Sequence, residues 1–202
     1  MNKSVLSISL DPAILTEAYA DARQRQIAYA KHFDSYVIII LTNKVRAVQN
    51  TYYSGNLRVF ATNVWWKPLA IFSALAITTK INRKYHFDVV TAQDPLATGL
   101  IAWIISVFFH IPLNIQLHST YYFDKGWLEE RFINRILSVL IRFVLSQAHS
   151  IRVVSKKVHQ RLIKIYPEKQ IMHIPMMVDL DFFYKKVTEK KEIINFVSVG
   201  RL

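Results

Sequence analysis

The chain has 202 residues and is 52% hydrophobic, which is enough to fill the core of one full domain and argues against disorder. It has no cysteine, which excludes disulfides, thiolate metal sites and cysteine nucleophiles and favours a reducing compartment such as the cytoplasm. The formal net charge of +12 suits an anionic membrane surface, nucleic acid or phosphorylated substrates equally well.

Short apolar runs alternate with longer helical patterns along the chain. In chain order, the apolar runs predict strands over residues 5–10, 36–41, 57–60, 89–91, 113–117, 151–154 and 171–174. The intervening patterns predict helices over residues 22–33, 68–85, 96–109, 128–145 and 156–165. This alternation is typical of an α/β fold, with a doubly wound, parallel, Rossmann-like sheet whose strands are buried on both faces and whose helices lie on both faces.

Ligands of such sheets bind beyond the carboxyl ends of the strands. The polar residues that follow the predicted strands are therefore the candidates: Asp11, Thr42, Gln93, Asp94, His118, Ser119 and Ser155. The four glycines form no G-x-G-x-x-G turn, and there is no phosphate-binding lysine loop and no H-E-x-x-H motif. The sequence therefore predicts neither a dinucleotide cofactor nor a catalytic metal.

Several segments then follow one another in a characteristic order: DVVTAQDPL (88–96), IPLNIQLH (111–118), QAHSIRVVS (147–155), IPMMVDLDFF (174–183) and FVSVGRL (196–202). This series resembles the amino-terminal domain of family 4 retaining glycosyltransferases, which have the two-domain GT-B fold. The third segment is similar to the family's AD-x-I-R-V-V-S, the fourth to I-P-N-G-V-D-x-x-x-F and the last to V-G-R-L. Residues 1–85 fit the family only in their general layout of strands and helices.

The resemblance implies roles for particular residues. His118 would lie beside the transferring sugar, where hydrogen bonding positions the donor and steadies developing positive charge. Arg201 would contact the donor diphosphate, a role suited to a permanently charged guanidinium. Asp94, Tyr121 and Ser155 would lie on the acceptor side. A nucleotide-diphosphate sugar would serve as co-substrate, with no bound cofactor and no metal.

Structural explanations remain open for the same residues. From the residues alone, His118 would also suit a hydrogen-bonded histidine at the edge of a sheet. Asp94 and Ser155 stand where short side chains cap the first turn of a helix. The aromatic group that includes Tyr121 and Trp127 would also suit a core, and the Trp65-Trp66-Lys67-Pro68 segment suits packing, a membrane interface or stacking on a sugar.

The resemblance also predicts the domain organisation. Residues 1–178 would form the acceptor domain, residues 179–192 a charged linker, and residues 193–202 the first strand of a donor domain that continues beyond Leu202. The sequence departs from the family pattern at His149, where an aspartate is usual, and at Met176-Met177, where Asn-Gly is usual. The resemblance places the lysine and the E-x7-E region of the donor domain beyond Leu202, so donor binding by this chain alone is not expected.

The sequence thus predicts part of a retaining glycosyltransferase that acts on a saccharide or lipid-linked acceptor in polysaccharide biosynthesis. Its basic charge predicts a cytoplasmic protein in peripheral contact with the anionic inner face of a membrane. A truncated, non-catalytic α/β binding module is the main alternative. A nucleic-acid-binding domain is a weaker one, since no zinc-finger or RNA-recognition motif is present, and nucleic acid is not an expected partner.

Overall fold

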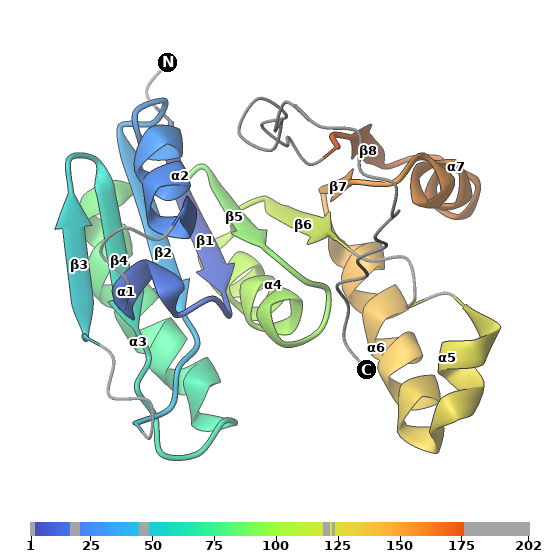
Figure 1. Cartoon of the computed structure of the whole chain (residues 1–202). Helices are drawn as coiled ribbons and strands as arrows, with labels where there is room; N and C mark the ends of the chain where they lie inside the picture. The colour runs from blue at the N-terminus through green and yellow to red at the C-terminus, as the bar shows by residue number, and fades with distance from the viewer. Residues whose placement is uncertain (1–2, 17–20, 45–48, 119–121, 123, 176–202) are drawn as a thin grey trace, which may run out of the picture.

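A computed structural model describes residues 3–16, 21–44, 49–118, 122 and 124–175. Its elements are, in chain order, β1 (Ser4–Ser9), α1 (Ala13–Thr16), α2 (Asp21–Ala30), β2 (Ser35–Ile40), β3 (Thr51–Ser54), β4 (Leu57–Ala61), α3 (Leu69–Tyr85), β5 (Val89–Ala92), α4 (Ala97–Phe109), β6 (Leu113–Leu117), α5 (Lys125–Glu130), α6 (Phe132–Gln147), β7 (Ser150–Val153), α7 (Lys156–Ile165) and β8 (Gln170–His173). The strands form one eight-stranded sheet in the order β3-β4-β2-β1-β5-β6-β7-β8 (Figure 1). The α/β class and the Rossmann-like topology predicted from the sequence are thereby confirmed.

The strand order reverses between β1 and β5, which pair in parallel beside each other at the centre of the sheet. The chain runs outward from β1 through β2 to β4, then crosses back through α3 to β5 and continues outward to β8. A reversal of this kind leaves a crevice at the carboxyl ends of the two central strands, because the connections leave them in opposite directions. The topology therefore points to the end of the sheet beyond Ser9 and Ala92.

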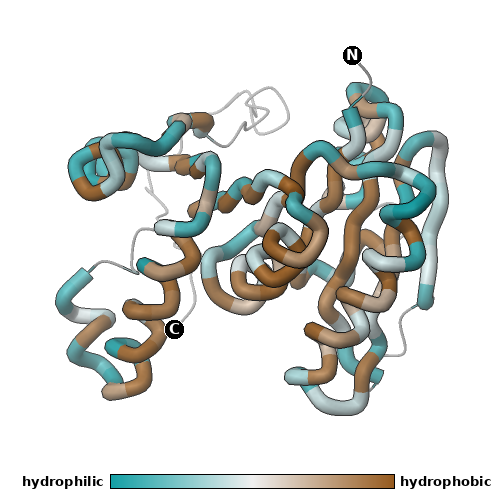
Figure 2. Tube along the Cα trace, turned by 180° about the vertical axis from the view of Figure 1, so that it is seen from behind, coloured by the Kyte–Doolittle hydropathy of each residue, from teal (hydrophilic) through white to brown (hydrophobic). Residues whose placement is uncertain are grey.

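Two clusters of buried apolar side chains lie on the two faces of the sheet. The larger cluster joins Leu6 and Ile8 of β1 to residues of α3, α4, α6 and α7. The smaller joins Val5 of β1 and Ile38 of β2 to residues of α1 and α2. Figure 2, the view from behind, shows hydrophobic residues running through the central strands and along α4 and α6. Helices thus lie on both faces, as the sequence predicts.

The predicted burial of every strand on both faces is wrong for the strands away from the centre of the sheet. β1 and β2 are buried along almost their whole length, but β6 and β7 alternate between buried and partly exposed residues. Asn114, Gln116 and Arg152 fall on one face, whereas their neighbours Ile115 and Ile151 fall on the other, because successive side chains of a strand alternate. The sheet therefore has a polar face opposite α4 and α6.

The single helix predicted over residues 128–145 is also wrong, because two helices occupy the segment. Arg131 has extended dihedral angles, φ −148° and ψ 141°, and separates α5 from α6. The Asn134 amide donates a 2.7 Å hydrogen bond to the carbonyl of Trp127 and so satisfies one acceptor near the end of α5. No proline or glycine lies at the break. The hydrophobic periodicity continues across it, which is why the sequence predicted a single helix.

An antiparallel hairpin of β3 and β4 was not predicted from the sequence either. Gly55, at φ +55°, and Asn56 connect the two strands, which pair from Ser54 with Leu57 to Thr51 with Phe60. Residue pairs rich in glycine and asparagine favour such tight turns, because they adopt positive φ at little cost. The strand β3 is short and has no aliphatic run, so the sequence did not predict it. Because β3 pairs with β4 in the antiparallel sense, the sheet is mixed at its β3 edge.

Other boundaries agree closely with the sequence. The predicted strand over residues 113–117 and the predicted helix over residues 156–165 are confirmed to the residue. Pro68 stands at the N-terminal cap position of α3, where its missing N–H costs nothing. Within the described part of the chain, no helix combines the length and apolarity needed to cross a bilayer.

Candidate functional site

His118 directly follows β6, at the carboxyl edge of the sheet, where its side chain is exposed. It continues the alternation of Asn114 and Gln116 and so belongs to the polar face of that strand. Its imidazole makes no hydrogen bond within the described part of the chain. Neither ring nitrogen is therefore engaged by a described residue, at the edge where α/β sheets bind ligands.

A row of hydrogen bonds crosses the polar face beneath His118. The Arg152 Nη1 donates to Gln116 Oε1 at 3.2 Å, and Gln116 Nε2 donates to Thr91 Oγ1 at 3.1 Å. The Thr91 hydroxyl donates to Asn114 Oδ1 at 2.9 Å, and Asn114 Nδ2 donates to Ser150 Oγ at 2.8 Å. We call Thr91, Asn114, Gln116, Ser150 and Arg152 the polar row. It fixes Arg152, whose Nε is buried and has no hydrogen-bond partner among the described residues.

The pKa of His118 lies below its ordinary value of 6.5. Partial desolvation of the ring is the largest cause, and the positive charge of Arg152 adds to it, whereas the carboxylate of Asp94 opposes both. The imidazole is therefore neutral at pH 7. Because the unfolded chain binds the proton more tightly, His118 reduces stability as the pH falls below 6.5, and the loss is complete below the folded-state pKa.

Substitution of Arg152 with glutamine is expected to raise the pKa of His118 toward 6.5, because a positive charge that disfavours the imidazolium is removed. The rise should be partial, since desolvation is the larger cause. Histidine titration by NMR measures it, with His118→Gln assigning the resonance. Lys156→Gln, a charge change on the exposed start of α7, is the control. An unchanged pKa in Arg152→Gln would show that Arg152 exerts no influence on the ring.

Asp94 forms a tight turn between β5 and α4. Its Oδ1 accepts a 2.7 Å hydrogen bond from the backbone N–H of Leu96, and its Oδ2 lies 2.7 Å from the hydroxyl of Thr98. The Thr98 hydroxyl also accepts from the N–H of Asp94 at 3.0 Å. The carboxylate is therefore engaged at the start of α4, which favours the structural explanation of Asp94. Its role toward an acceptor stays a prediction.

The other predicted site residues have mixed outcomes. Ser155 stands at the N-terminal cap position of α7, as predicted, but its side chain makes no capping hydrogen bond. Tyr121 and Arg201 lie outside the described residues, as do the predicted linker and the strand that begins the donor domain. Tyr122 is buried in the larger core cluster, where its ring meets Trp127 edge to face at 5.9 Å.

His149 shows how the chain accommodates a departure from the family pattern. The backbone N–H of Leu113 donates to His149 Nδ1 at 3.1 Å, and the backbone N–H of His149 donates to the carbonyl of Leu113 at 2.9 Å. A carboxylate at this position would offer the same kind of acceptor to the same N–H. The imidazole thus ties the end of α6 to the start of β6 in place of an aspartate.

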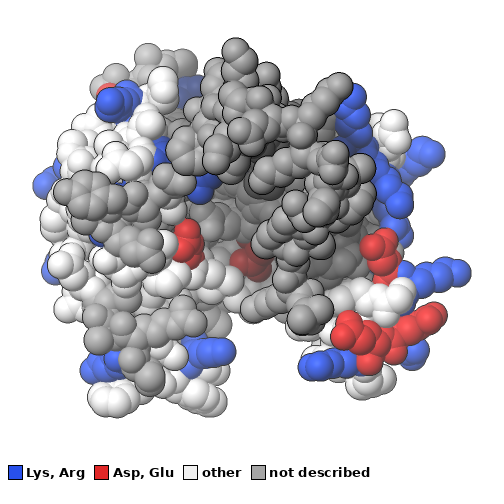
Figure 3. Space-filling model, viewed as in Figure 1, with Lys and Arg blue, Asp and Glu red and all other residues white. Residues whose placement is uncertain are grey.

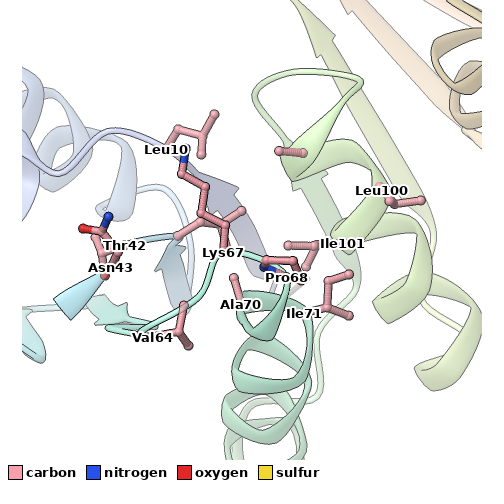
Figure 4. A pocket seen from close by; sticks show the side chains of 12 residues that line it. Leu10, Thr42, Asn43, Val64, Lys67, Pro68, Ala70, Ile71, Leu100 and Ile101 are labelled. Atoms are coloured by element: carbon pink, nitrogen blue, oxygen red, sulfur yellow. The ribbon is translucent and has the colours of Figure 1, made fainter. Parts of the chain in front are cut away.

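A pocket of about 660 Å³ opens at the carboxyl ends of β1, β2 and β4. Most of its lining is apolar, and Lys67 supplies a cation; the lining residues are Leu10, Leu41, Thr42, Asn43, Val64, Lys67, Pro68, Ala70, Ile71, Ala97, Leu100 and Ile101. Figure 4 shows the Lys67 side chain reaching from the turn before α3 toward Leu10. The pocket lies at the end of the sheet that the reversal of strand order indicates, and its size is typical of small-molecule sites.

Sequence reasoning did not identify this pocket, because its walls come from four separated segments of ordinary apolar residues. The only signal was the Trp65-Trp66-Lys67-Pro68 segment. Packing is excluded as the main role of its two indoles, which are 77% and 66% exposed. The Lys44 ammonium lies 4.7 Å from the centre of the Trp65 ring, a cation–π contact.

Within the residues that the structure describes, no three His, Asp or Glu side chains gather in a way that would hold a metal ion. The carboxyl edge carries the imidazole of His118 and an apolar pocket with one ammonium group, and the polar row lies on the adjoining face of the sheet.

Residues 32–182 match the family model described as Glycosyltransferase Family 4. The chain belongs to glycosyltransferase family 4. The match includes residues 32–87, where the sequence resembled the family only in general layout, so the membership extends further toward the N-terminus than the motifs indicated. No curated protein matches this family 4 chain significantly.

Solved structures share the fold of this family 4 chain at low sequence identity. Sucrose-phosphate synthase from Thermosynechococcus elongatus matches with a TM-score of 0.62 and 13% identity, over 90% of this chain and 50% of that one. Phytolacca americana UGT2, complexed with UDP-2fluoro-glucose and pterostilbene, has a TM-score of 0.54 and 10% identity, over 89% and 55%. UDP-GlcNAc 2-epimerase from Methanocaldococcus jannaschii has a TM-score of 0.52 and 16% identity, over 85% and 45%. The family 4 chain thus spans about half the length of these three.

Proposed function

We propose that this chain is the acceptor-binding domain of a retaining glycosyltransferase with the GT-B fold. The complete enzyme transfers a sugar from a nucleotide-diphosphate sugar to a saccharide or lipid-linked acceptor. The match to glycosyltransferase family 4 over residues 32–182 carries the proposal. The pocket and His118 support it, because both lie at the carboxyl edge of the sheet, where the acceptor and the donor sugar would meet.

The neutral imidazole of His118 suits the role proposed for it. As the bond between sugar and diphosphate breaks, positive charge develops on the sugar ring. A neutral ring donates and accepts hydrogen bonds beside that charge without repelling it, whereas an imidazolium would repel it. Arg152 and the desolvation of His118 keep the ring in this form at neutral pH.

Calorimetric titration with a panel of nucleotide diphosphates tests the proposal. We compare this chain with a longer version that continues through the proposed donor domain. The longer protein should bind one or more of the nucleotides, whereas this chain should bind them weakly or not at all, because Arg201 stands only at the beginning of that domain. If neither protein binds any nucleotide, the transferase proposal fails and the non-catalytic binding module is favoured.

We also propose that the protein acts in the cytoplasm, in peripheral contact with the anionic inner face of a membrane. The outer side of α6 carries an exposed apolar stripe in which Phe132 is 75% and Val139 68% exposed, with Ile136 between them. Arg135 and Arg142 belong to the same helix, and the sequence has no acidic residue between Glu130 and Glu168. Apolar stripes with basic flanks are typical of helices that lie on anionic membranes.

Binding to vesicles that contain phosphatidylserine is expected and should weaken as salt is raised, because screening removes the electrostatic part. Phe132→Ser combined with Val139→Ser should weaken binding about tenfold or more, since exposed apolar area is lost from the contact. Val107→Ser, on the exposed side of α4, is the control. Sedimentation of the vesicles measures the effect. An absence of binding, or binding that is independent of salt, would contradict the proposed contact.

A further inference from the structure

Large exposed apolar side chains lie in the segment that forms one wall of the pocket at the carboxyl edge. Trp65, Trp66, Leu69 and Phe72 lie in the turn before α3 and in its first residues, and Phe72 is 68% exposed. We call these four residues the apolar rim. Pro68, which lines the pocket, stands between Trp66 and Leu69, so the rim and the pocket wall belong to the same segment. Exposed apolar surface next to an apolar pocket is unusual on a soluble domain and indicates a binding surface.

The stretch of sequence that supplies most of the pocket lining carries charge of one sign. The sequence has no acidic residue between Asp34 and Asp88, and this stretch contains Lys44, Lys67 and five further basic residues, Arg46, Arg58, Lys80, Arg83 and Lys84. Figure 3 shows Lys and Arg side chains in the lower left part of the molecule and acidic side chains nearer its middle. The Lys67 ammonium makes no ion pair or hydrogen bond in the described part of the chain, so it remains available to an anion.

The pocket offers few polar partners to a saccharide. The Thr42 hydroxyl donates to Asn63 Oδ1 at 2.7 Å and accepts from the N–H of Asn63 at 3.0 Å, so it is already engaged. Lys67 and Asn43 are the other polar residues of the lining. A sugar placed here would lose hydrogen bonds between its many hydroxyl groups and water without regaining them from the protein. A hydrocarbon chain has no hydrogen bonds to water to lose, and its burial is favourable.

From these observations we infer that the pocket binds the hydrocarbon part of a lipid phosphate, with the phosphate held at its mouth by Lys67. This inference rests on the proposed function, for which it names the acceptor class: the sugar would be added to a lipid-linked anionic acceptor. The apolar rim would hold the first carbons of the chain as they enter the pocket. The phosphate would thereby lie near the edge of the sheet at which His118 stands.

Isothermal titration with monomeric alkyl phosphates tests the inference on the full 202-residue chain. Octyl and decyl phosphate are used below their micelle concentrations, with inorganic phosphate and octanol as comparison ligands. Affinity should rise about fourfold for each added methylene, the usual gain for burying one. Inorganic phosphate should bind far more weakly than decyl phosphate. Equal affinity for inorganic and alkyl phosphates would overturn the inference and indicate a plain anion site.

Two variants separate the pocket from the charge at its mouth. Ala97 is exposed at the start of α4 and lines the pocket, so Ala97→Phe narrows the pocket without disturbing the core and should lower decyl phosphate affinity at least tenfold. Lys67→Gln should lower it roughly fivefold, as expected for one exposed ion pair, while the gain per methylene persists. Lys80→Gln, also exposed on α3, is the matched control and should have no effect. Unchanged affinity in Ala97→Phe would place the ligand elsewhere.

Vesicles distinguish a lipid in the pocket from a membrane at the surface. If monomeric alkyl phosphates do not bind, but Trp65→Ser and Trp66→Ser abolish binding to anionic vesicles, the rim is a membrane-docking surface and the inference is wrong. Failure of this inference can also be distinguished from failure of the proposed function, because the two are tested with different ligands. Nucleotide binding by the longer protein without alkyl phosphate binding would leave the transferase intact and exclude this acceptor class.

Discussion

His118→Ala is expected to lower kcat for sugar transfer about 100-fold, with little change in the affinity for the nucleotide. Removal of one preorganised hydrogen-bonding group at the reacting centre typically costs roughly 10²–10³ in rate. His118 stands at the carboxyl edge, is neutral at pH 7 because its pKa is lowered, and has an imidazole that the described residues leave without a hydrogen bond. The alanine side chain neither donates nor accepts, so the developing charge would lose a partner.

The measurement uses the longer protein that includes the proposed donor domain, with release of nucleotide diphosphate from its preferred donor as the readout. His118→Gln retains hydrogen bonding and should recover part of the loss. His32→Ala is the control, because His32 is exposed before β2, at the opposite edge of the sheet. Equal losses of kcat in His118→Gln and His118→Ala, accompanied by a loss of stability, would indicate a structural role instead.

The second large effect concerns the turn that begins α4. Gly99→Ala is expected to reduce the free energy of unfolding by about 1–3 kcal/mol, as overpacking commonly does. A Cβ at Gly99 would lie 2.7 Å from the carbonyl oxygen of Asp94 and 3.2 Å from Val144 Cγ1. The first of these neighbours is backbone in a turn that the Asp94 carboxylate fixes by accepting hydrogen bonds from Leu96 and Thr98, so it cannot move away as a flexible side chain would.

Helix propensity acts in the opposite direction, since alanine is better than glycine in a helix by about 1 kcal/mol. The steric clash of the added Cβ should nevertheless outweigh the gain in helix propensity, because the whole turn would have to shift to relieve it. Gly126→Ala in α5 isolates the propensity, because no atom lies within 4 Å of its added Cβ. Urea denaturation compares the two variants. Equal stability of both would mean that the Asp94 carbonyl accommodates the methyl group.

The elements that the sequence predicted best are those in which local signals agree. The strand over residues 113–117 alternates apolar and polar residues, and the helix over residues 156–165 begins after a serine at its cap position. The break at Arg131 gave no such signal, because Asn134 supports it through a hydrogen bond to Trp127 rather than through proline or glycine. Features that depend on contacts between separate segments cannot be predicted from local sequence patterns.

The candidate site likewise contains residues that the sequence predicted and residues that it did not. His118 was identified from its place after a predicted strand, and Asp94 was recognised as a helix-start residue because short acceptors favour such positions. The polar row was not, because Thr91, Gln116 and Arg152 become neighbours only when β5, β6 and β7 pair in register. The influence of Arg152 on the pKa of His118 follows from that pairing.

The sequence by itself determined the α/β class, the family and the edge of the sheet at which to look for a site. These follow from periodic patterns and from short motifs, both of which are local along the chain. Only the tertiary structure decided where an apolar pocket forms and which cation serves it. Leu10, Leu41, Lys67 and Leu100 are far apart in sequence and converge because the strand order reverses beside β1. The same packing left the two indoles largely exposed, with the Lys44 ammonium against the Trp65 ring.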